Sequence, residues 1–239
     1  MKNKEIRQKL AAAYRVMALK DMDDLTYTHL SVKVDQYDSF LIQPFGLRFA
    51  EVKASNLLQV SFDSNVISGE EKLYNRTGYV IHGSIYKARP DVKAIFHLHT
   101  PAGVAVSAMK GGLLPISQFA LHFYNKISYH KYDSLSIHSG QGESLIKDLG
   151  KNYVAFLENH GTLVCGRSIE EAMFFSHHLE QACKVQVLLS GALDRVIIPN
   201  DDICKKANDD LLNFEQKLGE RDWAALIRQI NLIDKSYLD

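Results

Sequence analysis

The stretch His82-Gly-Ser-Ile-Tyr-Lys-Ala-Arg-Pro-Asp-Val-Lys-Ala-Ile-Phe-His-Leu-His99 predicts a helix followed closely by a buried strand. Apolar residues recur at helical spacing over 78–87, and Arg89-Pro90 ends that pattern. Residues 94–99 then form a short apolar run that stops before Pro101. A buried strand of this kind needs helices on its faces, so the stretch favours a layered α/β protein.

The same reasoning extends in both directions along the chain. We expect further strands at 31–34, 40–43, 153–157 and 162–166, and helices at 4–22, 168–190, 201–218 and 221–230. Ser168 is the expected N-cap of the long helix, with Glu171 completing a capping box. Neither an internal repeat nor a Pro/Ser-rich linker interrupts the chain, which predicts a single domain over 1–239.

Composition and charge exclude several classes of protein. The 239 residues are 46% hydrophobic and 23% charged, and 28 basic residues balance 28 acidic ones. This balance disfavours nucleic-acid binding as the main function, and the apolar runs are far shorter than the ~20 residues of a membrane span. Three cysteines without a C-x-x-C pair (Cys165, Cys183, Cys204) are typical of a reducing compartment, so we expect a cytoplasmic protein.

Three of the ten histidines form a candidate metal site. His97 and His99 lie two residues apart on a predicted strand, so both imidazoles point to the same side. His160 follows another apolar strand, and three histidines with an open fourth position are typical of catalytic zinc. Two hydrogen-bonded structural histidines remain the alternative. We expect structural or surface roles for the other seven: His29, His82, His122, His130, His138, His177 and His178.

Several motifs together resemble the class II aldolase/adducin family, most closely its adducin-like branch. They are the 82–99 stretch, Leu113-Leu-Pro-Ile-Ser117, Asn159-His-Gly161, and the loops 27–33 and 44–47. The resemblance covers roughly residues 5–195. It implies a three-layer α/β/α sandwich around a mostly antiparallel sheet. It also implies a divalent ion, usually zinc, on His97, His99 and His160, and a cyclic homotetramer with sites between subunits.

The match departs from the family's aldolases at two positions. The family's acid/base glutamate falls at Gly78, and its proton-donating tyrosine falls at Phe119. Both proton-transfer groups are therefore missing. The family's substrate-binding positions correspond to Thr28, His29, Gln43, Gly46, Arg76 and Thr77. The replacement of a loop asparagine by His29 leaves a substrate contact and an ordinary polar loop residue equally open.

Two hypotheses about function follow. The intact histidine set favours a metal-dependent lyase of the aldolase type, or an isomerase, acting on a small hydroxylated carbonyl or sugar-phosphate substrate. Gly78 and Phe119 favour a non-catalytic binding or assembly module like the adducin head, which retains a metal site. Of the two, we favour the enzyme, because buried histidines without a metal would be costly.

Overall fold

A single mixed sheet forms the centre of the molecule. The computed structural model describes residues 3–34, 37–70, 76–133 and 139–239. Their eight strands lie in the order β4-β3-β2-β1-β5-β8-β7-β6, and every neighbouring pair is antiparallel except β6 and β7. The strands are β1 (His29–Val34), β2 (Ser39–Ile42), β3 (Leu58–Ser61), β4 (Val66–Ser68), β5 (Ala94–Leu98), β6 (Ile127–His130), β7 (Val154–Leu157) and β8 (Gly161–Gly166).

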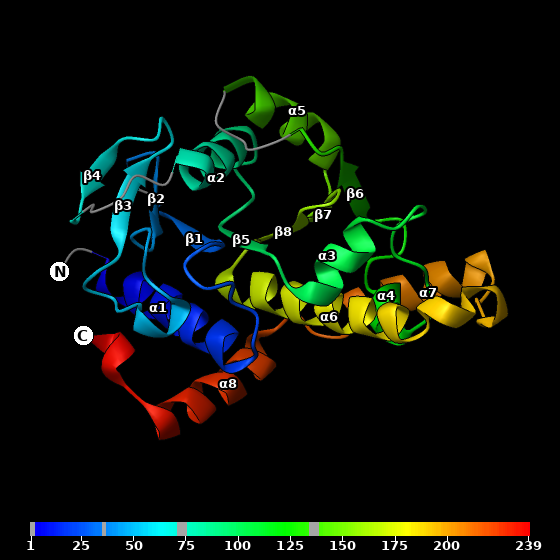
Figure 1. Ribbon diagram of the computed structural model, residues 1–239. Helices are drawn as coiled ribbons and strands as arrows, with labels where there is room; N and C mark the ends of the chain where they lie inside the picture. Colours follow the sequence, from blue (N-terminus) through cyan, green and yellow to red (C-terminus); the bar gives the residue numbers. More distant parts are fainter. Residues whose placement is uncertain (1–2, 35–36, 71–75, 134–138) are drawn as a thin grey trace.

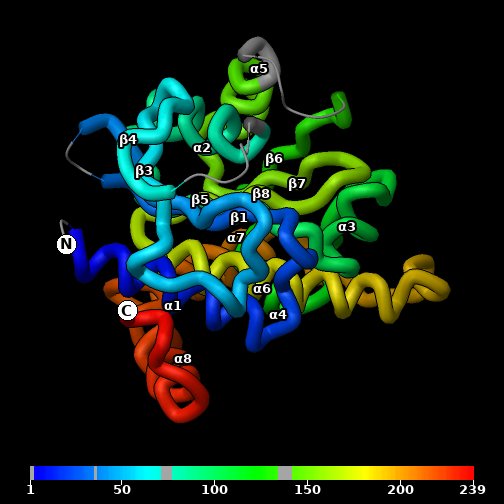
Figure 2. The backbone as a smooth tube through the Cα atoms, turned by 60° about the vertical axis from the view of Figure 1, so that its left-hand side comes forward, coloured from blue at the N-terminus to red at the C-terminus, as the bar shows by residue number. Residues whose placement is uncertain are grey.

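Helices cover both faces of this sheet (Figure 1). The helices α2 (Arg76–Ala88) and α5 (Ser139–Leu149) lie on one face, and α1 (Lys4–Leu19) and α6 (Ile169–Leu188) lie on the other. Figure 2 shows the same three layers from another side. The remaining elements are α3 (Pro101–Ser107), α4 (Gln118–Leu121), α7 (Asp201–Leu212), α8 (Glu220–Ile233) and the 3-10 turns η1 (Phe49–Glu51), η2 (Ser190–Arg195) and η3 (Ser236–Leu238). The predicted α/β/α sandwich with a mostly antiparallel sheet is confirmed.

The side chains of β5 point alternately into two hydrophobic cores, one on each face of the sheet. Ala94 and Phe96 belong to the core that includes α1 and α6, whereas Ile95 belongs to the core that includes α2. Because side chains alternate along a strand, His97 lies on the same face as Ile95. The candidate site therefore begins on the α2 side of the sheet, near its middle.

The start of α6 shows where local sequence rules hold and where they fail. The Ser168 hydroxyl accepts a hydrogen bond from the Glu171 amide at 3.1 Å, as an N-cap should. The predicted capping box is wrong in its second half, since the Glu171 carboxylate accepts from the Arg167 amide and guanidinium instead. The charged guanidinium offers a stronger hydrogen bond than a neutral backbone amide. The helix expected to reach residue 218 also ends earlier, at Leu212.

Among the described residues, no helix combines the length and the apolar character that crossing a membrane requires.

Candidate metal centre

Three imidazoles converge where the neighbouring strands β5 and β8 meet, at the end of β5 and the start of β8. His97 is in β5, His99 follows its last residue, and His160 lies in the turn between β7 and β8. The His99 Nε2 atom is 3.0 Å from Nε2 of His97 and 3.0 Å from Nε2 of His160. β5 and β8 are antiparallel neighbours, with Leu98 opposite Thr162. That pairing brings the turn to the strand end, which the sequence alone does not reveal.

The other ring nitrogens show which atoms face the centre. His97 Nδ1 lies 3.0 Å from the Thr162 carbonyl oxygen, and His99 Nδ1 lies 3.0 Å from Asp24 Oδ2. Both partners only accept hydrogen bonds, so both Nδ1 atoms carry the proton. The two Nε2 atoms therefore hold lone pairs that point toward each other. A cation between them would remove this repulsion, and a hydrogen-bonded second nitrogen is what metal-binding histidines usually show.

The donor set fits a zinc ion. Zinc–nitrogen bonds of about 2.0–2.1 Å in a tetrahedral arrangement separate two ligand atoms by roughly 3.3 Å, close to the 3.0 Å distances found here. The ligand atoms of the three histidines all lie within 4.8 Å of one another. His97 is buried, whereas His99 and His160 are half-buried. One side of the cluster therefore stays open to a small molecule.

Burial keeps two of the three clustered imidazoles, those of His97 and His160, neutral. Desolvation lowers the pKa of His97 well below its ordinary value, and the neighbouring histidines lower it further. Desolvation, followed by the proximity of His99, lowers the pKa of His160 to about 4. Neutral imidazole is the form that binds metal, so these two rings need no deprotonation at neutral pH.

The turn that carries His160 depends on two unusual positions. Asn159 has a left-handed backbone with φ of 57°, a conformation that asparagine tolerates better than most residues. A Cβ atom on Gly161 would lie 2.4 Å from the Leu98 carbonyl oxygen. Glycine therefore allows β8 to begin directly against the end of β5, and this contact fixes the position of His160.

Three of the predicted substrate residues lie at the ends of β1 and β2: Thr28 precedes β1, His29 begins it, and Gln43 follows β2. His29 lies opposite His97 in the sheet register, and their ring centroids are 5.0 Å apart. Thr28 is buried in a left-handed conformation with φ of 58°, and its hydroxyl has no hydrogen-bond partner among the described residues. Gln43 is buried, and its amide nitrogen donates to the Thr28 carbonyl oxygen at 2.9 Å. Gln43 thus supports the loop that carries Thr28.

The remaining predicted positions lie on flanking elements. Gly46 is exposed in a loop with φ of 97°, and Thr77 is half-buried in the first turn of α2. Arg76 begins α2, and its side chain lies outside the described part of the structure. Phe119 is on α4, where its ring lies 5.9 Å from that of His178. Substrate binding stays a prediction for all six positions: Thr28, His29, Gln43, Gly46, Arg76 and Thr77.

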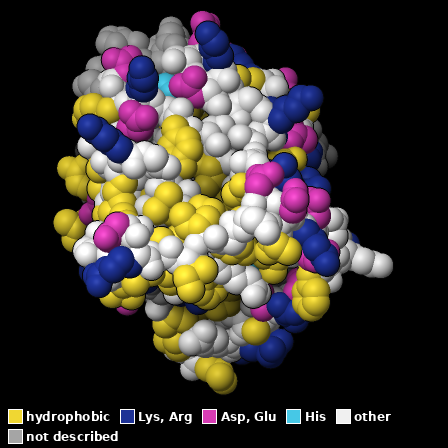
Figure 3. All heavy atoms as spheres, turned by 90° about the vertical axis from the view of Figure 1, so that its right-hand side faces the viewer, with side chains coloured by type: hydrophobic (Ala, Val, Ile, Leu, Met, Phe, Trp, Pro, Cys, Tyr) yellow, Lys and Arg dark blue, Asp and Glu magenta, His cyan; other side chains and the backbone are white. Residues whose placement is uncertain are grey.

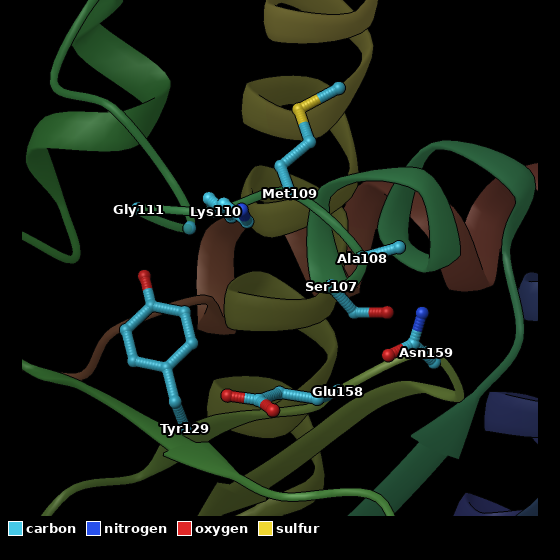
Figure 4. A pocket seen from close by; sticks show the side chains of 9 residues that line it. Ser107, Ala108, Met109, Lys110, Gly111, Tyr129, Glu158 and Asn159 are labelled. Carbon is cyan, nitrogen blue, oxygen red and sulfur yellow. The ribbon is translucent and has the colours of Figure 1, made fainter.

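A cavity of about 410 Å³ lies beside the histidine turn (Figure 4). Its nine lining residues include Glu158 and Asn159, which precede His160, together with Lys110 and the Tyr129 side chain. Figure 4 shows the Glu158 carboxylate and the Tyr129 ring along one wall. None of the three clustered histidines lines this space, so the cavity adjoins the centre without containing it.

Two residues that the sequence analysis did not place at the site contact it. Asp24 fixes the His99 ring, and no motif around it signals this role. His82 Nε2 lies 2.7 Å from His29 Nδ1. A signal for His82 existed, since it falls four residues after Gly78 and so shares one face of the helix with it.

The fold and the histidine cluster together define a class of protein. The family model "Class II Aldolase and Adducin N-terminal domain" matches residues 8–187. This chain belongs to the class II aldolase/adducin family.

The individual relatives include both aldolase-type proteins and an adducin. An aldolase II superfamily protein from Pseudomonas syringae superposes with a TM-score of 0.92 at 40% identity, covering 99% of this chain and 96% of that one. An L-fuculose 1-phosphate aldolase from Glaciozyma antarctica superposes with a TM-score of 0.86 at 27% identity, covering 98% and 92%. Alpha-adducin of Rattus norvegicus is 44% identical over 188 residues, which are 77% of this chain and 25% of the adducin.

Proposed function

We propose that this chain is a metal-dependent lyase that cleaves a carbon–carbon bond in a small hydroxylated carbonyl compound, or isomerises such a compound. In this proposal a zinc ion is held by His97, His99 and His160. The observation that carries it is the orientation of the imidazoles, whose Nδ1 protons are bonded outward while their Nε2 lone pairs converge. The full-length similarity to the L-fuculose 1-phosphate aldolase supports a sugar phosphate as one substrate class.

A bound dication would polarise the substrate's carbonyl and hydroxyl oxygens and stabilise the negative charge that develops on them. The protein's own residues prepare this chemistry. Asp24 and the Thr162 carbonyl hold the ring nitrogens of His99 and His97 in one tautomer. The half-buried sides of His99 and His160 leave room for a small ligand.

A second candidate function is a binding or assembly module without catalysis. The observation that favours it is the pair of missing proton-transfer groups at Gly78 and Phe119, together with the 44% identity to an adducin. A general acid or base typically contributes ~10²- to 10⁴-fold to a rate, so its loss would leave a weak enzyme or none. Metal binding alone does not separate the two functions, whereas catalysis does.

The first experiment measures metal and activity together. Zinc-reconstituted wild type should hold one zinc ion per chain, and a His97→Ala, His99→Ala double variant should hold far less. Wild type is then screened for retro-aldol cleavage over a panel of hydroxyketone phosphates and hydroxy acids, with and without a chelator. Equal zinc contents in the two proteins would refute the ligand set.

The second experiment restores the missing carboxylate. Gly78→Glu should raise a chelator-sensitive cleavage rate, because it restores on α2 the proton-accepting carboxylate that the family resemblance expects there. Gly78→Gln is the matched control, since it has the same size but cannot ionise. Thermal melting must first show that both variants fold. If the cleavage rates of zinc-loaded wild type and Gly78→Glu both stay at background over the whole panel, the non-catalytic binding module becomes the better hypothesis.

We also propose that the chain is one domain that assembles into a homo-oligomer, with a tetramer favoured. One sheet takes strands from 29–166, and α8 packs back on α1. Large apolar side chains are exposed from the last residue of α6 to the start of α7, among them Leu188 at 84% and Ile197 at 89%. Figure 3 looks onto this side of the molecule and shows apolar side chains on its surface. Burying them against a second copy would remove this exposure.

Light scattering tests this assembly, and a stable mass near 27.0 kDa would contradict it. The three cysteines are free and buried, which supports our placement of the protein in the reducing cytoplasm.

A further inference from the structure

A row of four buried polar side chains leads from the protein interior to the candidate metal centre. The Tyr86 hydroxyl is 2.8 Å from Ser31 Oγ, and Ser31 Oγ also bonds His82 Nδ1. His82 Nε2 is 2.7 Å from His29 Nδ1. All four residues are buried, and the row ends where the His29 ring packs beside His97.

The hydrogen-bond partners fix the direction in which this row donates. Desolvation raises the pKa of Tyr86 well above its ordinary value, so its hydroxyl keeps its proton. Among the described residues Ser31 is the sole hydrogen-bond partner of that hydroxyl. If Tyr86 accepted rather than donated, its proton would be buried without a partner, at a cost of about 1–3 kcal/mol. Tyr86 therefore donates to Ser31, and the Ser31 proton goes to His82 Nδ1.

The hydrogen-bond partners of His82 and His29 fix the positions of their ring protons in the same way. An imidazole nitrogen that accepts a hydrogen bond carries no proton, so the ring proton is then on the other nitrogen. His82 Nδ1 accepts from Ser31, so the proton of His82 is on Nε2 and is donated to His29 Nδ1. The proton of His29 must then be on its own Nε2.

We propose that His29 presents this Nε2–H group as a hydrogen-bond donor to a substrate oxygen bound at the metal centre. Among the described residues Nε2 of His29 has no hydrogen-bond partner, and His29 is not part of the cluster of convergent ligand nitrogens. A protonated Nε2 can neither ligate a metal nor accept a proton. His29 is therefore neither a fourth ligand nor a substitute for the base missing at Gly78.

This donor narrows the substrate class of the proposed enzyme, on which the inference rests. A donor beside a metal site favours a compound that places a carbonyl oxygen or a developing oxyanion there. A hydrogen bond to a charged oxygen typically changes affinity about tenfold or more.

Nitrogen NMR of the full chain tests the tautomer directly. Protein labelled with ¹⁵N-histidine, with His29 assigned through a His29→Gln variant, should show a protonated Nε2 and an unprotonated Nδ1 at His29. Ser31→Ala removes the donor to His82 and should yield a mixture of both His29 tautomers. A wild-type His29 with its proton on Nδ1, or with mixed tautomers, would overturn the proposal.

Binding of acetohydroxamate to the zinc-loaded protein tests the role of the donor. His29→Met should weaken this oxyanion probe about tenfold, His29→Gln should weaken it less, and zinc affinity should stay at the wild-type value in both. A loss of zinc affinity in His29→Met would identify His29 as a ligand and refute the donor role. If wild type binds no zinc, the proposed function fails, while the NMR measurement on the metal-free chain still decides the tautomer.

Discussion

Replacing Asp24 by asparagine should weaken zinc binding without unfolding the protein. The Asp24 carboxylate accepts the Nδ1 proton of His99 at 3.0 Å and so makes that imidazole a better ligand. Loss of such a partner typically costs 10–100-fold in metal affinity. The Asp24 side chain is 41% exposed and solvent screens its charge, so we expect the lower end, about tenfold, or ~1.4 kcal/mol.

Competition with a chromogenic chelator gives the zinc Kd of wild type and variant under the same conditions. Asp23→Asn is a matched control, because Asp23 is the adjacent carboxylate and pairs with Arg48 at 3.6 Å, away from the histidines. Asp24→Asn should shift the Kd, and Asp23→Asn should not. Equal zinc affinities in both variants and wild type would refute the role that we assign to Asp24.

Three further perturbations test the fold around the site. Acidification from about pH 7.5 to about pH 5 should lower the urea midpoint of the metal-free protein. Burial lowers the folded pKa of His122 and of His160 to about 4, so below about pH 6.5 the unfolded chain binds protons that the folded chain excludes. A constant midpoint over that range would count against these shifts. Thr28→Gly should raise the free energy of unfolding, measured in urea, by about 1 kcal/mol. The reason is that glycine adopts a φ of 58° without the strain of a branched side chain. A decrease in the free energy of unfolding would show that the threonine is not strained. Gly161→Ala should weaken zinc at least tenfold in the chelator assay, since its Cβ would lie 2.4 Å from the Leu98 carbonyl oxygen, and an unchanged Kd would contradict the close approach.

The parts that the sequence predicts well depend on short-range periodicity. The helix before the central strand and the shared face of His97 and His99 both follow from the spacing of apolar residues. The position of His160 beside them depends on the pairing of two strands more than sixty residues apart, which local patterns do not encode. There the family resemblance supplied what periodicity could not.

The parts that the sequence does not predict depend on single side chains in tertiary contact. Asp24 is one of several aspartates in the loop before β1, and only its distance from His99 distinguishes it from the others. The helix spacing places His82 on the same face as Gly78, but its hydrogen bond with His29 depends on how β1 packs against α2. Glu171 satisfies the capping pattern, yet bonds to Arg167, because a nearby cation competes for the same carboxylate.

The contact between His99 and His160 joins segments 61 residues apart in the chain. An ion bound there would act as a removable cross-link, closing a long loop that the unfolded chain leaves open. Zinc at a hundred times its Kd would add about 2.7 kcal/mol to the free energy of unfolding. The supply of metal would then affect the protein's resistance to proteolysis as well as the occupancy of the site.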